Sequence, residues 1–197
     1  DKQPTLAYRL ETISGTTPNL GDRAGVYFMP VRQANLLALD RMKKLAAGMG
    51  FSQEPEQLAT SQYQWVNDDP VPATLIADVV SGSFRLEIRW QTDPTILSET
   101  NLPTEFQAVN EAKQYLQNLD LLPEDLKDGK TTVTWLKADV DQLVKAVSQS
   151  QADFAQVDLF RAAIEEKAVY PPNPDRGVAS IIFSKSNVSG KRVVELN

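Results

Sequence analysis

The sequence predicts an α+β fold of two related units, each a long helix packed on a curved antiparallel sheet. The main basis is an internal correspondence: Ala38–Asp69 aligns without a gap on Ala108–Asp139, and five paired positions are identical. Both segments begin with an amphipathic helical pattern and continue with short alternating patterns typical of strands. Helices followed by sequential strands with short connections favour the α+β class. The alternative is that two unrelated amphipathic stretches fall into partial register by chance.

The first unit is expected to span residues 1–92 and to open with a pair of strands, Tyr8–Ile13 and Val26–Val31. A helix is predicted over Gln33–Gly48, because apolar residues recur there at three- and four-residue steps before two glycines. Alternation of apolar and polar residues then predicts three strands, at Gln62–Val66, Ala73–Val80 and Ser83–Trp90.

Residues 93–103 are polar, contain two prolines and are expected to link the first unit to a second unit at residues 104–197. The helix of this second unit is predicted over Thr104–Leu119, where Thr104 and Gln107 form a capping-box pattern. The strand patterns that follow are short and lie at Thr131–Lys137, Gln142–Val147, Phe154–Phe160, Ala168–Tyr170, Gly177–Ser184 and Arg192–Leu196.

The composition excludes several classes of chemistry. The 197 residues contain no cysteine and no histidine, and the net charge is −6. Disulfides, thiol nucleophiles, Ser-His-Asp mechanisms and histidine-based metal sites are therefore excluded, whereas carboxylate or lysine chemistry and oxygen-ligated cations are not. Basic residues occur in runs no longer than pairs, so no clustered positive surface for nucleic acid is expected. We expect no cofactor.

The location of the protein is predicted from the start of the chain. No apolar run approaches the roughly 18–20 residues of a membrane span. The chain begins at Asp1 and not at a methionine, which we interpret as the loss of a signal peptide or an N-terminal anchor. With the lack of cysteine, this predicts an extracytoplasmic protein of the cell envelope that contacts the membrane only through the missing anchor. A cytoplasmic fragment is the alternative.

Two groups of residues are candidates for ligand sites. Trp65, Trp90 and Trp135 could stack on a sugar or a peptide, but alternating strand positions favour a place in the core. Asn67–Asp69 offers oxygen ligands for Ca²⁺, but the spacing of a calcium-binding loop is missing. Pro70 follows directly and indicates a turn instead.

A catalytic site is not predicted. Asp158 and the pair Glu165–Glu166 are the carboxylates that a glycosidase would need, but no spacing shows that two of them face each other. Asn187–Ser189 fits the pattern of a glycosylation acceptor, which also occurs often by chance. We therefore expect that the protein is not an enzyme.

The predicted interaction surface lies near the C-terminus. Its first part is the loop Pro171–Gly177, which three prolines stiffen, so that Asp175 and Arg176 can be presented at low entropic cost. Its second part is the strand Gly177–Ser184, which is expected at a sheet edge where an apolar strand needs a partner. The residues assigned to the surface are Asp175, Arg176, Gly177, Ile181 and Phe183. The alternative is a turn with a structural role only.

Several segments carry a family resemblance: Tyr8–Thr12 with Val26–Tyr27, Gly50–Phe51, Asn101–Pro103, Leu121–Pro123, Val157–Arg161, Pro172–Gly177 and Lys191–Glu195. Together they resemble a family of uncharacterised bacterial proteins, best known from candidate phyla with small genomes, that have an N-terminal membrane anchor and an extracytoplasmic domain. Each helix with its strands is also distantly similar to PepSY-type or cystatin-like modules. Such modules build accessory regulators of the cell-wall two-component system. The resemblance implies a truncated ectodomain without a catalytic motif.

The expected function is a non-enzymatic protein-interaction module of the bacterial cell envelope, used as a sensor, a regulator or an accessory. Its partner would be another protein or a second copy of the chain. One alternative is a structural subunit of a self-assembling cell-surface complex. The other alternative is a carboxylate-dependent glycan-active enzyme.

Overall fold

The computed structural model describes residues 11–12, 15–16, 37–98 and 102–197. The chain divides into two compact units, Asp1–Val31 and Arg32–Asn197, and all helices and strands below belong to the second. In the first unit the backbone N–H of Gly15 donates to the carbonyl of Thr12 at 3.0 Å. Apart from residues 11 and 12, the two predicted N-terminal strands lie outside the described residues.

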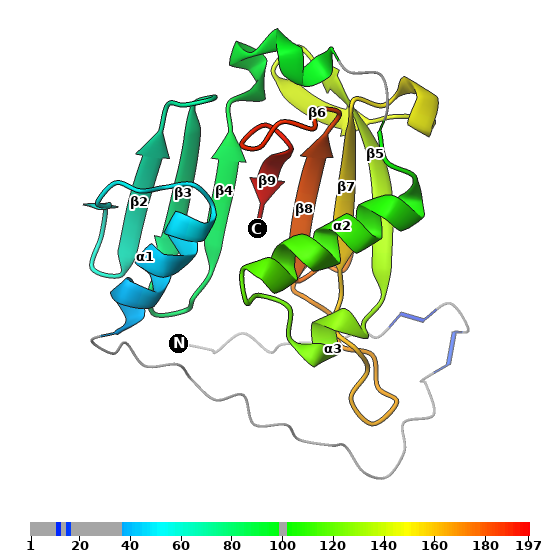
Figure 1. Cartoon of the computed structure of the whole chain (residues 1–197). Coiled ribbons are helices and arrows are strands. Elements are labelled where there is room, and N and C mark those ends of the chain that lie inside the picture. Colours follow the sequence, from blue (N-terminus) through cyan, green and yellow to red (C-terminus); the bar gives the residue numbers. More distant parts are fainter. Residues whose placement is uncertain (1–10, 13–14, 17–36, 99–101) are drawn as a thin grey trace, which may run out of the picture. The chain divides into compact units, whose positions relative to one another are not determined.

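Nine strands form one continuous antiparallel sheet in the order β1-β2-β3-β4-β9-β8-β7-β5-β6 (Figure 1). Every pair of neighbouring strands is antiparallel. The strands are β1 (Glu56–Gln57), β2 (Gln62–Asn67), β3 (Ala73–Asp78), β4 (Phe84–Ile88), β5 (Thr131–Asp139), β6 (Gln142–Lys145), β7 (Phe154–Leu159), β8 (Ala179–Ser184) and β9 (Val193–Leu196).

The prediction of two units, each with its own sheet and a long helix, is wrong. The C-terminal strand β9 joins the two sets of strands, since Leu196 lies opposite Leu86 of β4 on one side and opposite Ile181 of β8 on the other. The described residues contain three helices, and all are short: α1 (Ala38–Gly48) has 11 residues, α2 (Glu105–Asn118) has 14 and α3 (Glu124–Lys127) has four. None of them is long and apolar enough to cross a membrane.

Both longer helices pack on the same face of the sheet. Figure 1 shows α1 over β2 and β3 and α2 across β8, β7 and β5. Each helix buries residues at four-residue steps, which places them on one stripe. The buried residues are Ala38, Met42 and Ala46 in α1 and Ala108, Ala112 and Leu116 in α2.

The helices α1 and α2 resemble each other locally, as the alignment of the two sequence segments suggests. The buried positions of α1 and α2 are matched at the same offset as the two aligned segments. Both helices also end alike: the N–H of Phe51 donates to the carbonyl of Ala46 at 2.9 Å, and that of Leu121 to Leu116 at 2.8 Å. This is the 6→1 bond of a Schellman ending. The predicted capping box of Thr104 with Gln107 is confirmed.

The strand predictions were correct in position for most of the sheet. Eight of the nine strands coincide with predicted segments within a few residues, and β1 was not predicted. Ala168–Tyr170 was predicted as a strand and forms none; an isolated bridge between Ile164 and Lys167 precedes it. Trp90 lies in a 3₁₀ turn, η1 (Trp90–Thr92), just past β4.

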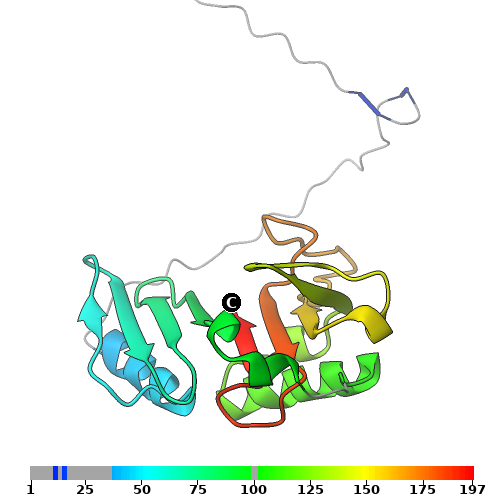
Figure 2. The ribbon, with the colours of Figure 1, turned by 90° about the horizontal axis from the view of Figure 1, so that it is seen from above.

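The core follows one row of side chains across the sheet. The registers place Trp65, Leu75, Leu86, Leu196, Ile181 and Val157 opposite one another in turn on neighbouring strands. These six side chains are at most 4% exposed. Because side chains alternate between the faces of a strand, the residues next to them form a second row on the other face. Both α1 and α2 lie on the opposite side of the sheet, and Figure 2 shows the hairpin of β5 and β6 arching over this face.

Candidate functional site

The face of the sheet without helices carries a polar row. From β3 to β7 the cross-strand neighbours are Thr74, Glu87, Glu195, Ile182 and Gln156. A strand face that packs on nothing is normally a mixture of exposed polar residues. Here Ile182 and Gln156 are 2% and 9% exposed, so part of this row is covered.

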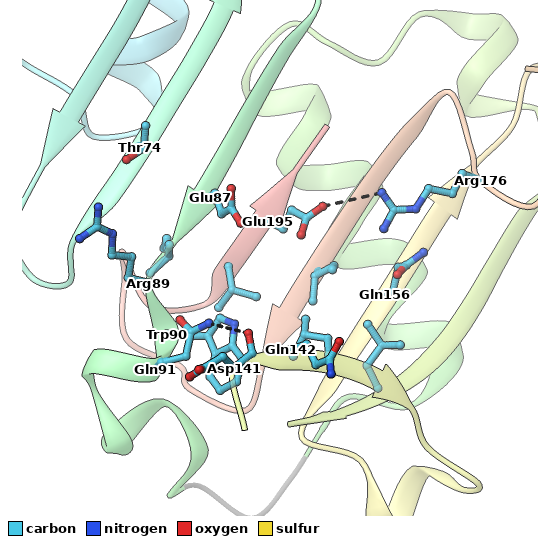
Figure 3. A pocket seen from close by; sticks show the side chains of 15 residues that line it. Thr74, Glu87, Arg89, Trp90, Gln91, Asp141, Gln142, Gln156, Arg176 and Glu195 are labelled. Atoms are coloured by element: carbon cyan, nitrogen blue, oxygen red, sulfur yellow. Dashed lines mark hydrogen bonds and ion pairs between the residues drawn. The ribbon is translucent and has the colours of Figure 1, made fainter. Parts of the chain in front are cut away.

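The cover creates a groove of about 570 Å³. Its floor is the polar row, and its walls are the tip of the β5–β6 hairpin and the turn η1, as Figure 3 shows. The side-chain amide of Gln91 in η1 donates to the backbone carbonyl of Asp141 in the hairpin tip at 3.1 Å. This hydrogen bond ties the two walls together. Apolar residues complete the lining: Ile88, Trp90, Leu136, Leu143, Ile182 and Val194.

Glu195 is the most covered carboxylate of the groove, with its side chain 15% exposed. Its Oε1 accepts a hydrogen bond from Nδ2 of Asn197 at 2.6 Å. The same oxygen lies 3.8 Å from a guanidinium nitrogen of Arg176 and 3.9 Å from one of Arg85. Arg85 also lies 3.5 Å from both oxygens of Glu87. Two carboxylates thus sit side by side on neighbouring strands, with arginines at their margins.

A buried hydrogen-bond network fixes the loop above the groove. Asp158, in β7, is 1% exposed. Its Oδ2 accepts from the side-chain amide of Gln156 at 2.7 Å, and its Oδ1 accepts from the backbone N–H of Gly177 at 3.1 Å. Both oxygens of a buried carboxylate are therefore paired, as burial of a charge requires. Through Gly177 the network holds the preceding residue, Arg176, beside Glu195 (Figure 3).

Only part of the predicted interaction surface is exposed in the structure. Asp175 and Arg176 are exposed in their loop, as expected, and Arg176 lines the groove. Gly177 is packed so closely that a Cβ there would lie 2.6 Å from the backbone of Leu159.

The assignment of Ile181 and Phe183 to that surface was wrong. Both are fully buried, because β8 is a central strand between β7 and β9 and not an edge strand. The apolar run that suggested an exposed edge in need of a partner is instead the run of a strand covered on both faces.

The other candidates occupy separate places. Trp65 and Trp90 are buried, in agreement with the place in the core that their strand positions favoured. Trp90 makes an edge-to-face contact with Phe154, with 5.2 Å between the ring centroids. Trp135 is half-buried. Asn67 closes a turn by accepting from the backbone N–H of Asp69 at 3.2 Å. Within the described residues, no group of three metal-binding side chains occurs.

The carboxylates that the sequence offered for a glycosidase pair do not come together in the groove. Asp158 is fixed in the network of β7, while Glu165 and Glu166 lie in an exposed turn after that strand. The carboxylates that the fold brings together are Glu87 and Glu195, which the sequence did not indicate. Glu87 stands on the polar side of an alternating strand, and that signal alone marks exposure rather than a site.

Comparison with known proteins gives no relative. No protein-family model matches the chain, and neither a curated protein nor a solved structure shows significant similarity to it.

Proposed function

We propose that this chain is a non-enzymatic protein-interaction module whose groove receives an extended segment of a partner protein. The observation that carries the proposal is the groove of about 570 Å³ on the sheet face opposite α1 and α2. Binding sites of this size typically combine an apolar lining with a few polar groups that fix orientation. Here the apolar part includes Leu136 and Ile182, and the polar part includes Glu87, Gln156 and Glu195.

The dimensions suit a short extended segment. The floor from Thr74 to Gln156 crosses five neighbouring strands. With about 4.8 Å between strands, this row is about 19 Å long. An extended chain rises about 3.3 Å per residue, so about six residues would span it. A partner segment of this length would contact both the sheet and the hairpin.

A second candidate is a carboxylate-dependent glycan-active enzyme, because Glu87 and Glu195 are direct cross-strand neighbours in the groove. Such neighbours have Cβ atoms about 5 Å apart, a separation close to that of the carboxyl groups in retaining glycosidases. The pair differs from a catalytic one in one respect. Arg85 contacts both carboxylates, so they share a cation at their margin instead of facing each other across a substrate.

The proposed location is outside the cytoplasmic membrane, at the bacterial cell envelope, where the module would act as a sensor, a regulator or an accessory. The support is the cysteine-free composition and the family resemblance of the sequence. The codons upstream of Asp1 test this proposal. An apolar segment encoded there would agree with it, whereas a start codon directly before Asp1 would contradict it.

The function is tested by selecting random heptapeptides on the purified chain and measuring their binding to two variants. Gln142→Trp places an indole in the groove from an exposed position of the hairpin, whereas Lys145→Trp adds the same bulk outside the groove on the same strand. Selected peptides should bind the Lys145→Trp variant normally and lose at least about tenfold in affinity for Gln142→Trp. Equal binding to both variants would refute the groove as the binding site.

Two further measurements separate the alternatives. Release of reducing sugars from peptidoglycan that Glu195→Gln abolishes would favour the glycan-active enzyme. Sedimentation of the chain at micromolar concentration as large, regular assemblies would favour the structural subunit. The proposed module should show no glycan cleavage and should sediment as a monomer or a dimer.

A further inference from the structure

The strand β6 ends the sheet on one side and is also a wall of the groove. It pairs with β5 alone, and among the described residues no strand lies on its other side. Three consecutive residues at its start, Asp141–Leu143, line the groove. Successive side chains of a strand point to opposite faces, so a strand that lines a cavity with consecutive residues presents its edge to it. The unpaired edge of β6 therefore borders the groove.

The register identifies the backbone groups on this edge. The N–H of Ala146, just past β6, donates to the carbonyl of Trp135 at 2.8 Å. Hydrogen-bonded and non-hydrogen-bonded pairs alternate along an antiparallel ladder, and the same register continues along β6. Val144 therefore directs its N–H and C=O to β5, whereas Leu143 and Lys145 direct theirs away from it. Among the described residues, none hydrogen-bonds to these outward groups.

One carbonyl next to this edge already has a partner from the opposite wall. The side-chain amide of Gln91 donates to the backbone carbonyl of Asp141 at 3.1 Å, and Figure 3 shows the two residues side by side. The space beside the hairpin is therefore open to a donor that comes from the groove. Leu143 and Lys145 follow two and four residues further along, with carbonyls and N–H groups that have no such partner.

The side chains of the groove do not select one sign of charge. Arg89 and Arg176 line it together with Glu87 and Glu195. A ligand recognised by charge alone would meet both attraction and repulsion there. Recognition through the main chain does not depend on this balance, because every residue of a partner except proline has the same N–H and C=O groups.

Exposed apolar side chains flank β6. Val140 precedes it with 85% of its surface exposed, and Val147 follows it with 93%. They are the two most exposed large apolar side chains among the described residues. Single exposed apolar residues are common on proteins, but these two stand at the two ends of the one unpaired edge that borders the groove. A segment laid along β6 would contact both of them.

The opposite edge of the sheet lacks these features. It is formed by β1, which has two residues, Glu56 and Gln57, both exposed and polar. Short, charged edges are the usual means by which sheets avoid further pairing. Strand addition is therefore expected at β6 and not at β1.

We infer that β6 binds an extended segment of a partner protein by strand addition, in which the outward N–H and C=O groups of Leu143 and Lys145 pair with the main chain of the segment. In this mode the main chain supplies affinity and alternate side chains supply specificity. A groove of about 570 Å³ has the size of a site for a small ligand. It therefore admits a single chain segment, whereas a second copy would bring its whole sheet. The inference rests on the proposed function and specifies how the segment is held.

The test is amide hydrogen exchange of the ¹⁵N-labelled chain, measured with and without a heptapeptide selected on it. In the free chain the amides of Leu143 and Lys145 should exchange fast, because they have no acceptor. A saturating amount of the peptide should slow both by at least about tenfold. Val144 is the internal control: its N–H is held by β5, so its exchange should be slow in the free chain and change little.

N-methylation of the same heptapeptide tests the pairing from the side of the ligand. One methyl group is placed on each backbone nitrogen in turn, which removes the donor and adds bulk. In an added strand only alternate residues direct their N–H groups to β6. Losses of affinity of about tenfold should therefore occur at every second residue. Equal losses at all residues, or none, would contradict strand addition.

A pair of variants tests the edge itself. Lys145→Pro removes an outward N–H and leaves the ladder with β5, as proline does on edge strands, and should weaken peptide binding by about tenfold. Lys145→Ala removes only an exposed side chain and should bind as the wild type does. The exchange measurement on the unmodified chain decides the question even where the proline variant does not fold.

The possible results have distinct meanings. If exchange at Leu143 and Lys145 stays fast while the peptide still binds and still depends on Gln142, the inference fails and the proposed function stands. Slow exchange at both residues in the dilute free chain would show that the edge is closed and would overturn the inference as well. Protection that grows with the concentration of the free chain, together with sedimentation as a dimer, would assign the edge to a second copy instead. Failure to select any heptapeptide would overturn both the proposed function and the inference.

Discussion

Asp158 is the residue whose change tests the buried network most directly. Asp158→Asn preserves the size of the side chain but replaces one acceptor oxygen by an NH₂ group. The wild-type carboxylate accepts from Gln156 at one oxygen and from the N–H of Gly177 at the other. Whichever way the asparagine turns, one of these donors meets another donor in a site that is 1% exposed.

The magnitude follows from the two contacts. A hydrogen bond to a charged group contributes about 1.5–3 kcal/mol, and a buried donor left without an acceptor costs about 1–3 kcal/mol. One bond is lost and the other becomes neutral, so the free energy of unfolding should fall by about 2–4 kcal/mol. For a domain of this size, each kcal/mol corresponds to about 2–4 °C. The melting temperature should therefore fall by about 5–15 °C.

The assay is urea unfolding followed by tryptophan fluorescence, with amide hydrogen exchange of Gly177 as a local measurement. Exchange at Gly177 should accelerate, because its acceptor is weakened. The matched control is Asp141→Asn in the exposed hairpin tip, which should stay within about 0.5 kcal/mol of the wild type. A Asp158→Asn variant as stable as this control, with unchanged exchange at Gly177, would refute the network as a stabilising element.

Three further predictions concern other parts of the sheet. Leu196→Ala should lower the free energy of unfolding in urea by about 2–5 kcal/mol, because Leu196 is fully buried in β9. Leu196→Met should lower it by less than about 1.5 kcal/mol. Equal losses would contradict close packing where β9 joins the sheet. The pKa of Asp93 is lowered to about 2 by Lys191, whose Nζ lies 2.6 Å away, and by hydrogen bonds from the hydroxyl and the backbone N–H of Thr95. The contribution of Asp93 to stability should then be complete above the unfolded pKa of about 3.9 and disappear as the pH falls through 2. The melting temperatures of wild type and Asp93→Asn should therefore converge in acid. A constant difference from pH 7 to pH 2 would contradict this. Ser180→Ala should raise the free energy of unfolding by up to about 1 kcal/mol, since the buried Oγ has no hydrogen-bond partner among the described residues. A clear loss of stability would show that the hydroxyl is satisfied.

The local structure could be predicted from the sequence where one pattern decides it. The helix α2 was located because its apolar residues repeat at helical spacing and Thr104 provides its cap. The strands β2 and β4 were located because each buries one face only. Ile181 and Phe183 were assigned to an exposed edge strand because their segment is apolar. An apolar run is also typical of a central strand covered on both faces, and this second interpretation would have placed β8 inside the sheet.

The pairing of distant strands could not be predicted in the same way. The sheet is continuous because β9 inserts between β4 and β8, and nothing in its four residues specifies those neighbours. The same pairing places Glu195 beside Glu87. The candidate site is therefore a consequence of tertiary contacts, whereas the loop that carries Arg176 was recognisable from its prolines.

The two faces of the sheet differ in composition and in what covers them. On the helix side, the row through Leu86, Leu196 and Ile181 is apolar and closely packed. One residue further along the same strands, the opposite row contains Glu87 and Glu195, and it is partly covered by the hairpin. Burial of polar and charged groups lowers stability unless each is paired, and apolar residues of similar volume are often at least as stable there. Residues that violate the rule for a stable core are expected where a site has a function. Glu195, a carboxylate whose side chain is only 15% exposed in the groove, is such a residue.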